Sequence, residues 1–225
     1  MYHEITAWTR GIIMDKEARD VCNVVAAAAA DEGYYSQYIN DYVDAPDRTN
    51  CLIRKYARVS DSPIEELFVY ENARPDIVVL VEQTLIKAVN FFRGTPDGEG
   101  VVIVNTTKEP EYLLRFLPDA MLAKLKTIVA VDAARLAEPR GSSPWMYNRS
   151  LPELAYDRLS TEGAGEKRQV GVGIAAPLLG ALVAGTGVLK LESVVARCHD
   201  KEAVRRGYEG CKVLHYRSES HRATA

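Results

Sequence analysis

The sequence has few cysteines, and they are far apart. No CxxC spacing is present, and the 225 residues contain only Cys22, Cys51, Cys198 and Cys211. Zinc and iron–sulfur motifs usually begin with closely spaced cysteines, so we expect neither kind of centre in this chain. Four cysteines are also too few for a disulfide scaffold, and reduced thiols in a cytoplasmic protein are the default expectation.

Long hydrophobic runs and an excess of one charge are missing as well. The longest apolar stretches, residues 24–30 and 174–183, are too short to cross a bilayer, and the first ten residues lack the basic and apolar regions of a secretory signal. The 28 basic and 31 acidic residues give a net charge of −3, which provides no broad positive field for a polyanion. We therefore expect neither a membrane nor a nucleic acid among the partners.

Short β-branched runs alternate with helical stretches along the chain. Strands are expected at residues 3–8, 51–59, 76–81, 100–105 and 127–132. Helices are expected at residues 15–32, 83–92, 110–126, 133–137 and 191–207, with Gly33 ending the first of them. The alternation predicts an α/β fold, a Rossmann-like and mostly parallel sheet with helices on both faces. We expect one domain over residues 1–217 and a frayed tail at 218–225.

Two segments interrupt this pattern. Residues 141–168 are rich in glycine, serine, proline and charge and show no clean period, which indicates an irregular insertion or a partner-contacting loop. Residues 34–48 interleave four tyrosines with aspartates and one arginine just ahead of a strand. Tyrosine is favoured at interfaces, but a polar loop with solvated carboxylates explains this segment equally well.

Polar residues follow several of the expected strands, where parallel α/β sheets bind their ligands. Arg10 and Gly11 follow the first strand, Asn105 and Thr106 lie at the end of the fourth, and Asp132 at the end of the fifth. Such residues also serve as ordinary helix caps, and capping is the favoured interpretation for each, with ligand contact as the alternative.

A glycine pattern near the C-terminal third imitates a dinucleotide-binding motif. Residues 171–176 match GxGxxG/A, and Glu192 lies about twenty residues further on. No apolar strand precedes the glycines, and they come after the sheet instead of opening it. Small residues that permit close helix packing are therefore the favoured explanation.

Cysteine and histidine also occur close together near the C-terminus. Cys198 and His199 are adjacent, and Cys211 and His215 follow. Adjacent residues on one helix point about 100° apart, so the first two do not easily face a single zinc ion. Buried cysteines and solvated histidines are the favoured interpretation, and no metal site is expected.

The order of several short motifs resembles one enzyme family. Residues 179–193, LGALVAGTGVLKLES, resemble the LGA…TG…LESL segment of the gamma subunit of 2-oxoacid:acceptor oxidoreductases, thiamine-diphosphate enzymes typified by pyruvate:ferredoxin oxidoreductase. Further matching stretches follow the family order, namely GYYSQ at 33–37, DR at 47–48, PDIVVLV at 75–81, VVIVNT at 101–106 and VDA at 131–133.

The resemblance implies a non-catalytic subunit of a larger enzyme. Its relatives oxidatively decarboxylate a 2-oxoacid, usually to an acyl-CoA, together with alpha, beta and ferredoxin-like delta subunits. Thiamine diphosphate, Mg²⁺ and iron–sulfur clusters are then expected in those partner subunits and none in this chain, which would shape the entrance for CoA or the 2-oxoacid. The residues expected near these ligands are Arg10, Gly11, Asp44, Asp47, Arg48, Asn105 and Thr106.

Two departures from the family pattern suggest a specialised member. The usual glycine-rich GRGGQG turn is reduced to Arg10-Gly11, because Ile12 and Ile13 replace residues of the turn, and Ala175 stands where relatives carry asparagine. An aromatic 2-oxoacid, or a reaction without CoA, would fit such changes. The alternatives are a free-standing α/β nucleotide-binding protein and a purely structural subunit of such a complex.

Overall fold

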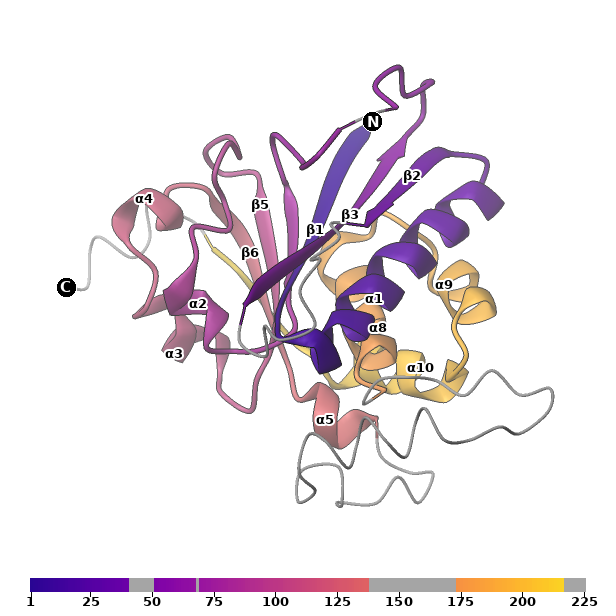
Figure 1. Cartoon of the computed structure of the whole chain (residues 1–225). Helices are drawn as coiled ribbons and strands as arrows, with labels where there is room; N and C mark the ends of the chain where they lie inside the picture. Colours follow the sequence, from indigo (N-terminus) through magenta and orange to yellow (C-terminus); the bar gives the residue numbers. More distant parts are fainter. Residues whose placement is uncertain (41–50, 68, 138–172, 217–225) are drawn as a thin grey trace.

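A seven-stranded sheet organises the chain, shown in Figure 1 as a computed structural model that describes residues 1–40, 51–67, 69–137 and 173–216. The strands lie side by side in the order β2-β3-β1-β4-β5-β6-β7. Their bounds are β1 Tyr2–Arg10, β2 Tyr35–Asn40, β3 Leu52–Ser60, β4 Ile77–Leu80, β5 Gly100–Asn105, β6 Leu125–Val131 and β7 Lys212–His215.

Most strands of this sheet run in one direction. β1, β4, β5 and β6 pair in parallel, whereas β3 and β7 run antiparallel to their neighbours. β2 has the direction of β1, since both are antiparallel to β3. Five of the seven strands therefore share a direction, which confirms the predicted α/β, mostly parallel sheet.

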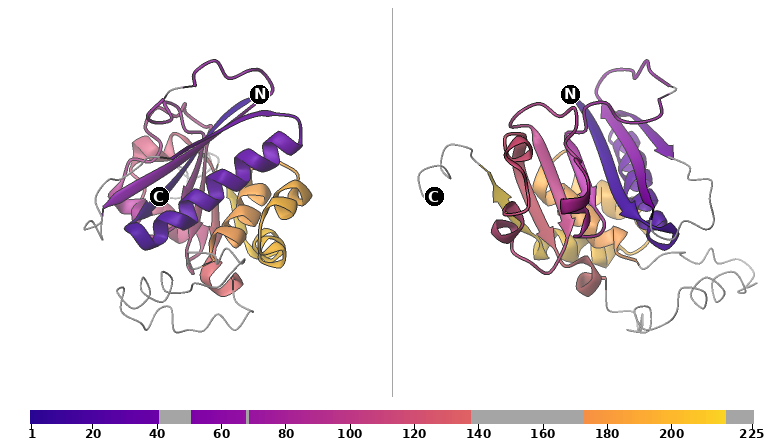
Figure 2. Two further views of the ribbon diagram at one scale, coloured as in Figure 1. Left: turned by 45° about the vertical axis from the view of Figure 1, so that its right-hand side comes forward. Right: turned by 60° about the vertical axis from the view of Figure 1, so that its left-hand side comes forward.

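One face of the sheet is covered by α1 (Ile12–Asp31), α8 (Ala175–Thr186), α9 (Leu191–Arg197) and α10 (Lys201–Gly210), as the two views of Figure 2 show. The alanine-rich sequence of α1 favours helix, and its small buried residues, such as Ala18, Ala28 and Ala29, let the helix lie close to β1 and β3. The helix ends before Gly33, whose φ of +85° is a left-handed conformation that glycine adopts easily.

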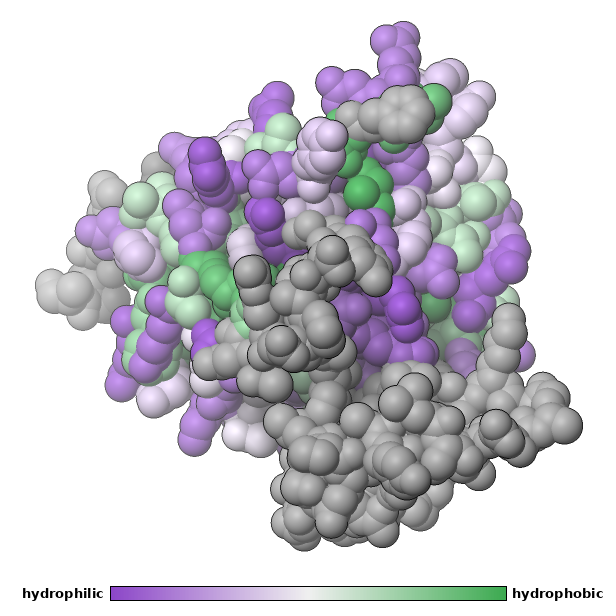
Figure 3. Space-filling model, in the orientation of Figure 1, coloured by the Kyte–Doolittle hydropathy of each residue, from purple (hydrophilic) through white to green (hydrophobic). Residues whose placement is uncertain are grey.

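The opposite face is covered unevenly. The short helices α2 (Leu85–Ala88), α3 (Pro110–Leu114) and α4 (Asp119–Leu122) belong to the half that lies over β4, β5 and β6, where a second hydrophobic core is buried. On this face β1 and β3 carry polar and aromatic side chains, and part of the connection between β3 and β4 lies against them. The surface seen in Figure 3 accordingly alternates hydrophobic and hydrophilic patches.

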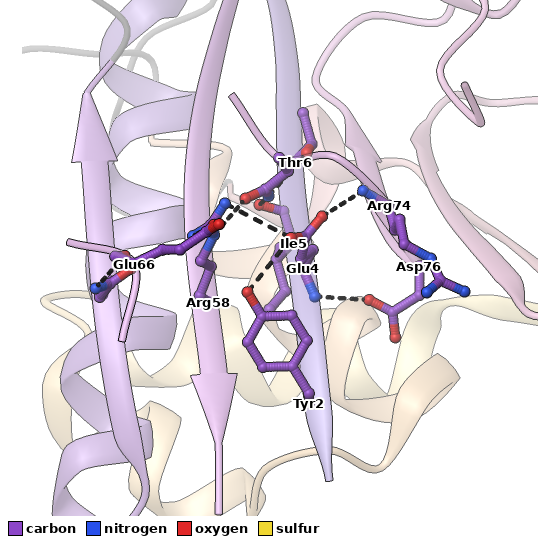
Figure 4. A network of polar contacts seen from close by, with 10 residues as sticks. Tyr2, Glu4, Ile5, Thr6, Arg58, Glu66, Arg74 and Asp76 are labelled. Carbon is purple, nitrogen blue, oxygen red and sulfur yellow. Dashed lines mark hydrogen bonds and ion pairs between the residues drawn. The ribbon is translucent and has the colours of Figure 1, made fainter. Parts of the chain in front are cut away.

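A buried polar network fastens that connection to the sheet (Figure 4). Arg58 on β3, only 1% exposed, lies 3.6 Å from the carboxylate of Glu4 on β1 and donates from Nε to Asn72 Oδ1 at 3.1 Å. Asn72 in turn donates to the carbonyl of Ile5 and to Thr6 Oγ1. These buried hydrogen bonds and the ion pair with Glu4 hold the loop on the sheet.

Residues 35–40 are not a loop, which was one of the two interpretations left open for residues 34–48. They form the edge strand β2, paired with β3 from Tyr35 opposite Ser60 to Asn40 opposite Lys55. Tyr38 packs on the α1 side of the sheet, where burial raises the pKa of its phenol to about 12. Tyrosine and isoleucine alternate with polar residues over these six positions, and this pattern is too short to predict a strand by itself.

Three of the predicted helices are shorter or divided. Residues 83–92 contain only the single turn of α2, because the chain is already extended at Val89. Residues 110–126 form α3 and α4, with Pro118 between them, and from Leu125 the chain belongs to β6. Proline lacks the N–H that a continuous helix needs, which explains the interruption.

Residues 191–207 likewise form two helices instead of one. α9 ends at Arg197, Cys198 is extended, and the side chain of Asp200 accepts from the N–H of Ala203 to cap α10. Cys198 and His199 therefore lie in the break between helices, not on one helix as the zinc argument assumed, with Cys198 buried and His199 exposed. The strand β7 that follows was not predicted.

The LGA segment of the family motif forms part of α8 and packs against α10. A Cβ at Gly180 would lie 2.0 Å from the carbonyl oxygen of Val204, and one at Gly207 would lie 2.1 Å from that of Pro177. The two helices thus approach so closely that only glycine fits on either side. In this chain the motif glycine is a packing residue, which agrees with the small-residue explanation given for this region.

Candidate functional site

The carboxyl ends of β1, β4, β5 and β6 lie along one edge of the sheet, as their parallel pairing requires. Arg10 ends β1, Asn105 ends β5, and Asp132 follows β6. This edge is the candidate functional site, because open α/β sheets bind ligands beyond the carboxyl ends of their strands.

Gly11 joins β1 to α1 in a backbone conformation that is almost restricted to glycine. Its φ is 75° and its ψ is 161°. Its N–H donates to the carbonyl of Cys51 at 3.0 Å, which brings the chain just before β3 to this turn. Among the described residues no side chain caps the N-terminus of α1, so the positive end of this 20-residue helix faces the turn.

Arg10 and Thr9 carry unused polar atoms at the same turn. The Nε of Arg10 and the Oγ1 of Thr9 are both buried, and neither has a hydrogen-bond partner among the described residues. Thr9 is fully buried, whereas Arg10 is half-buried. A buried donor without a partner typically costs about 1–3 kcal/mol, so a group that pairs with Arg10 would recover that free energy.

A carboxylate also lies in the first turn of α1, but it is neutralised. Asp15 forms an ion pair of 2.8 Å with the Nζ of Lys55, whose side chain is 3% exposed. Lys16 similarly pairs with Asp20 at 2.7 Å. The two lysines thus balance these two aspartates, and Glu17, further along α1, is bonded to N–H groups at the start of α8. Arg10 and the helix dipole favour an anion at the turn.

Both polar atoms of the Asn105 side chain form structural hydrogen bonds. Its Nδ2 donates to the carbonyl of Val81 at 3.0 Å, and its Oδ1 accepts from the N–H of Ala133 at 3.1 Å. The side chain thereby ties the end of β4 to the start of α5 (Ala133–Leu136). This geometry favours the scaffold interpretation of Asn105 over ligand contact.

Thr106 and Asp132 are occupied in the same way. Thr106 is buried, donates from Oγ1 to Gln83 Oε1 at 2.7 Å and accepts from the N–H of Lys108 at 3.0 Å. Asp132 caps α5 by accepting from the N–H of Arg135. The capping interpretation therefore describes this half of the edge. Of the predicted site residues that the structure describes, Arg10 is the one with a buried polar atom that has no partner among the described residues.

The other predicted residues, Asp44, Asp47 and Arg48, lie outside the described residues, as do the segments 141–168 and 218–225 and the first glycine of the GxGxxG pattern. Cys51 is the first described residue after the three, and its carbonyl accepts from Gly11. The role of Asp44, Asp47 and Arg48 stays a prediction.

The thiols are poorly suited to chemistry. Burial raises the pKa of Cys22 to about 12, and burial also raises the pKa of Cys198 and of Cys211. Within the described ranges no group of three or more histidine, cysteine or acidic side chains is placed to hold a metal ion. In the same ranges no helix is long and apolar enough to cross a membrane.

Sequence reasoning missed the charged residues that fasten the elements to one another. Glu17 on α1 is 1% exposed and accepts hydrogen bonds from the N–H groups of Gly173 and Ala175 at the start of α8. Lys55 stands on the inward face of β3 between Ile53 and Ala57. Glu17 and Lys55 could have been found in the sequence, because each is a charged residue among apolar ones. A charged residue at a buried position needs a partner there.

Comparison with known proteins agrees with the fold and with the motif order. The family described as pyruvate ferredoxin/flavodoxin oxidoreductase matches residues 21–209, which is most of the chain. The chain belongs to this family. The matched residues begin after the Arg10–Gly11 turn, the part that departs from the family pattern.

Relatives of similar length are gamma-type subunits. The chain is 26% identical over 209 residues to pyruvate synthase subunit PorC of Thermotoga maritima, covering 87% of this chain and 88% of the relative. It is 29% identical over 189 residues to the pyruvate/ketoisovalerate oxidoreductases common subunit gamma of Thermococcus kodakarensis, covering 84% and 78%. The resemblance to the gamma subunit is therefore confirmed.

Solved structures lead to the same conclusion about the fold. The crystal structure of pyruvate oxidoreductase subunit PORC of Thermotoga maritima has a TM-score of 0.60 at 25% identity, with 94% of this chain and 98% of that chain covered. A keto/oxoacid ferredoxin oxidoreductase gamma subunit of Geobacter sulfurreducens has a TM-score of 0.57 at 15% identity, with 93% of each chain covered, and shows a common fold.

Proposed function

We propose that this chain is the gamma-type, non-catalytic subunit of a cytoplasmic 2-oxoacid:acceptor oxidoreductase that also contains alpha, beta and ferredoxin-like delta subunits. Family membership and the full-length likeness to gamma subunits support the assignment. Thiamine diphosphate with Mg²⁺ would supply the decarboxylation chemistry, and iron–sulfur clusters the electron path, all held by the partner subunits.

Within that complex, the turn at Arg10 and Gly11 receives an anionic group of CoA or of the 2-oxoacid. The observation that carries this proposal is the buried Arg10 Nε, which has no partner among the described residues and lies next to a glycine turn and a helix N-terminus that no described side chain caps. Guanidinium groups bind carboxylates and phosphates with two parallel hydrogen bonds, and helix N-termini add N–H donors and a favourable dipole. Asn105 and Thr106 hold the neighbouring strand ends in place.

The replacement of the family glycines narrows what this turn can bind. Backbone N–H groups approach a phosphate closely where glycine follows glycine, and Ile12 and Ile13 remove that freedom from the first residues of α1. A single carboxylate that binds Arg10 needs fewer backbone N–H donors than a pyrophosphate does. The proposal therefore extends to an unusual 2-oxoacid, an aromatic one among the candidates, or to a reaction that does not use CoA.

The test uses the whole complex, purified anaerobically from its native source with its partner subunits. Decarboxylation is measured for a panel of aliphatic and aromatic 2-oxoacids, with and without CoA, for the wild type and for Arg10→Ala. We expect KM for the 2-oxoacid or for CoA to rise about tenfold or more in Arg10→Ala, because a charge-assisted contact is lost. Arg115→Ala, a change of the same kind at an exposed arginine of the short segment after α3, is the control and should leave both KM values unchanged.

Two results would contradict the proposal. A chain that purifies as a monomer without thiamine-diphosphate and iron–sulfur subunits contradicts the subunit assignment and favours a free-standing nucleotide-binding protein. An assembled Arg10→Ala complex with wild-type kinetics contradicts the anion-binding role and favours a purely structural subunit, an interpretation that the internal hydrogen bonds of Asn105 already suit.

A further inference from the structure

A pocket of about 570 Å³ opens on the sheet face opposite α1, between β1 and β3 and two loops, residues 71–75 and 89–94. Its volume lies in the range of about 300–1,000 Å³ that is usual for small-molecule sites. The residues that decide its chemistry are Trp8, Arg54, Tyr56, Glu71, Phe91 and Arg93.

Three aromatic residues line this pocket; Trp8 is half-buried, whereas Tyr56 and Phe91 are each only 1% exposed and form its floor. Trp8 on β1 and Tyr56 on β3 come from neighbouring strands, and Phe91 is contributed by the loop after α2. Arg54 lies over both strand aromatics, with its guanidinium carbon 5.2 Å from the Trp8 ring centre and 5.7 Å from that of Tyr56. The partly exposed Trp8 and the guanidinium that lies over it offer a flat surface and a cation, which together suit a planar ring.

The charged residues of the pocket leave one positive charge without a partner. Arg54 forms an ion pair of 2.6 Å with Glu71. Arg93 is exposed, and no carboxylate among the described residues lies within ion-pair distance of it. Glu71 already shows that the pocket can hold a carboxylate against Arg54, and Arg93 offers a second guanidinium for one.

The pocket is preformed because both loops are fixed. Asn72, in the first loop, is bonded to Ile5, Thr6 and Arg58 of the sheet. In the second loop, Gly94 has a φ of +86°, and a Cβ there would lie 2.0 Å from the carbonyl oxygen of Ala73. The two loops therefore contact one another at one side of the pocket. Because its walls are already ordered, ligand binding costs little conformational entropy of the protein.

We propose that this pocket binds an aromatic carboxylate, a small molecule with a planar ring and one carboxylate. The ring packs against the half-buried Trp8 and the flat guanidinium of Arg54, above the buried rings of Tyr56 and Phe91. The carboxylate pairs with Arg93 and competes with Glu71 for Arg54. The inference rests on residues of this chain alone, and it does not require the proposed function of the complex.

The test is a calorimetric titration of the full 225-residue chain with phenylacetate, in the absence of other subunits. Benzyl alcohol, which has the ring without the charge, and acetate, which has the charge without the ring, are titrated in parallel. We expect saturable binding of phenylacetate at a 1:1 ratio, and at least tenfold weaker binding of either comparison compound.

Three variants locate the binding. Arg93→Gln should weaken phenylacetate binding about tenfold or more, because the unpaired guanidinium is lost. Glu71→Gln should strengthen binding several-fold, since the ligand no longer competes with a resident carboxylate for Arg54. Arg115→Gln, the same change at an arginine that does not line the pocket, should have no effect.

The proposal is overturned if acetate binds as well as phenylacetate, or if Arg93→Gln and Arg115→Gln have equal effects, because binding would then be unspecific charge attraction. It is also overturned if a chain with wild-type circular dichroism shows no saturation up to about 20 mM phenylacetate. Tight binding of adenosine monophosphate in place of phenylacetate would equally reject it. Since activity is not measured, failure here leaves the test of the proposed function unaffected.

Discussion

Glu17 near the start of α1 accepts a hydrogen bond of 2.8 Å from the N–H of Ala175, which is 158 residues away and opens α8. Its other carboxylate oxygen accepts from Gly173 at 3.0 Å. The N-terminus of α8 has no cap from its own sequence, so the first helix of the chain supplies the negative group that the α8 dipole favours. The two helices that flank the candidate edge are thereby fixed relative to one another.

Glu17→Ala should lower the free energy of unfolding by about 2–4 kcal/mol, because two buried N–H groups lose a charged acceptor. Glu17→Gln retains one acceptor oxygen and should lower it by about half as much. Urea unfolding followed by circular dichroism measures both. Asp20→Ala removes a carboxylate of the same helix from a surface pair with Lys16 and should cost only about 0.5 kcal/mol. Equal losses in Glu17→Ala and Asp20→Ala would show that the cap is not important for stability.

Gly180→Ala and Gly207→Ala should each lower the free energy of unfolding by about 2 kcal/mol or more. In either variant the new methyl group meets a backbone carbonyl at about 2 Å, and α8 and α10 must separate. The loss exceeds the gain of about 1 kcal/mol that alanine brings to a helix interior. Thermal unfolding of the purified chain measures the change.

Gly210→Ala is the matched control for these glycines, because it lies on α10 and its Cβ would meet only the side chain of Leu136 at 3.2 Å or more. It should be neutral or slightly stabilising. If all three glycine variants behave alike, helix packing does not explain the glycine of the family segment.

The central strands could be predicted from the sequence because their signal is local. The runs at 76–81, 100–105 and 127–132 are β-branched and buried on both faces, and the structure has β4, β5 and β6 there. The edge strands β2 and β7 could not be predicted in this way. β7 has four residues, of which Lys212, Val213 and His215 are exposed, so no apolar alternation marks it.

For the candidate site, too, the sequence predicts where the residues lie but not which of them are already bonded. The position of Arg10, Asn105 and Asp132 at one sheet edge follows from the shared direction of their strands, which the alternation of strands and helices predicts. Which of these side chains is already occupied depends on partners 24 or 28 residues away, as with Asn105 and its contacts to Val81 and Ala133. Such contacts depend on strand order and register, which periodicity does not specify.

The buried pair of Glu4 and Arg58 gives a double-mutant cycle. Arg58→Met alone should lower the free energy of unfolding by about 3–5 kcal/mol, because it leaves the carboxylate of Glu4 buried without its cation. Adding Glu4→Gln to Arg58→Met should recover part of the loss, since no charge then remains uncompensated. Urea unfolding of the two single variants and the double variant measures the coupling. Additive losses in the double variant would mean that the two side chains act independently.

Because the thiol of Cys22 is buried, we expect the free energy of unfolding to fall at high pH. Burial raises the pKa of this thiol from its usual 9.0 to about 12, so the folded chain keeps the proton in a range where the unfolded chain releases it. The contribution of the thiol to stability is therefore complete below about pH 9 and disappears as the pH rises towards 12.

Between pH 8 and pH 10.5 the wild type should lose about 2 kcal/mol more than Cys22→Ala, which has no thiol at that position. Other groups that titrate in this range, Tyr38 among them, are present in both proteins, so their contribution cancels to first order. Urea unfolding at the two pH values measures the difference. The same loss in wild type and Cys22→Ala would show that the thiolate is stabilised in the folded chain as well as in water, and that Cys22 is not sealed between α1 and the sheet.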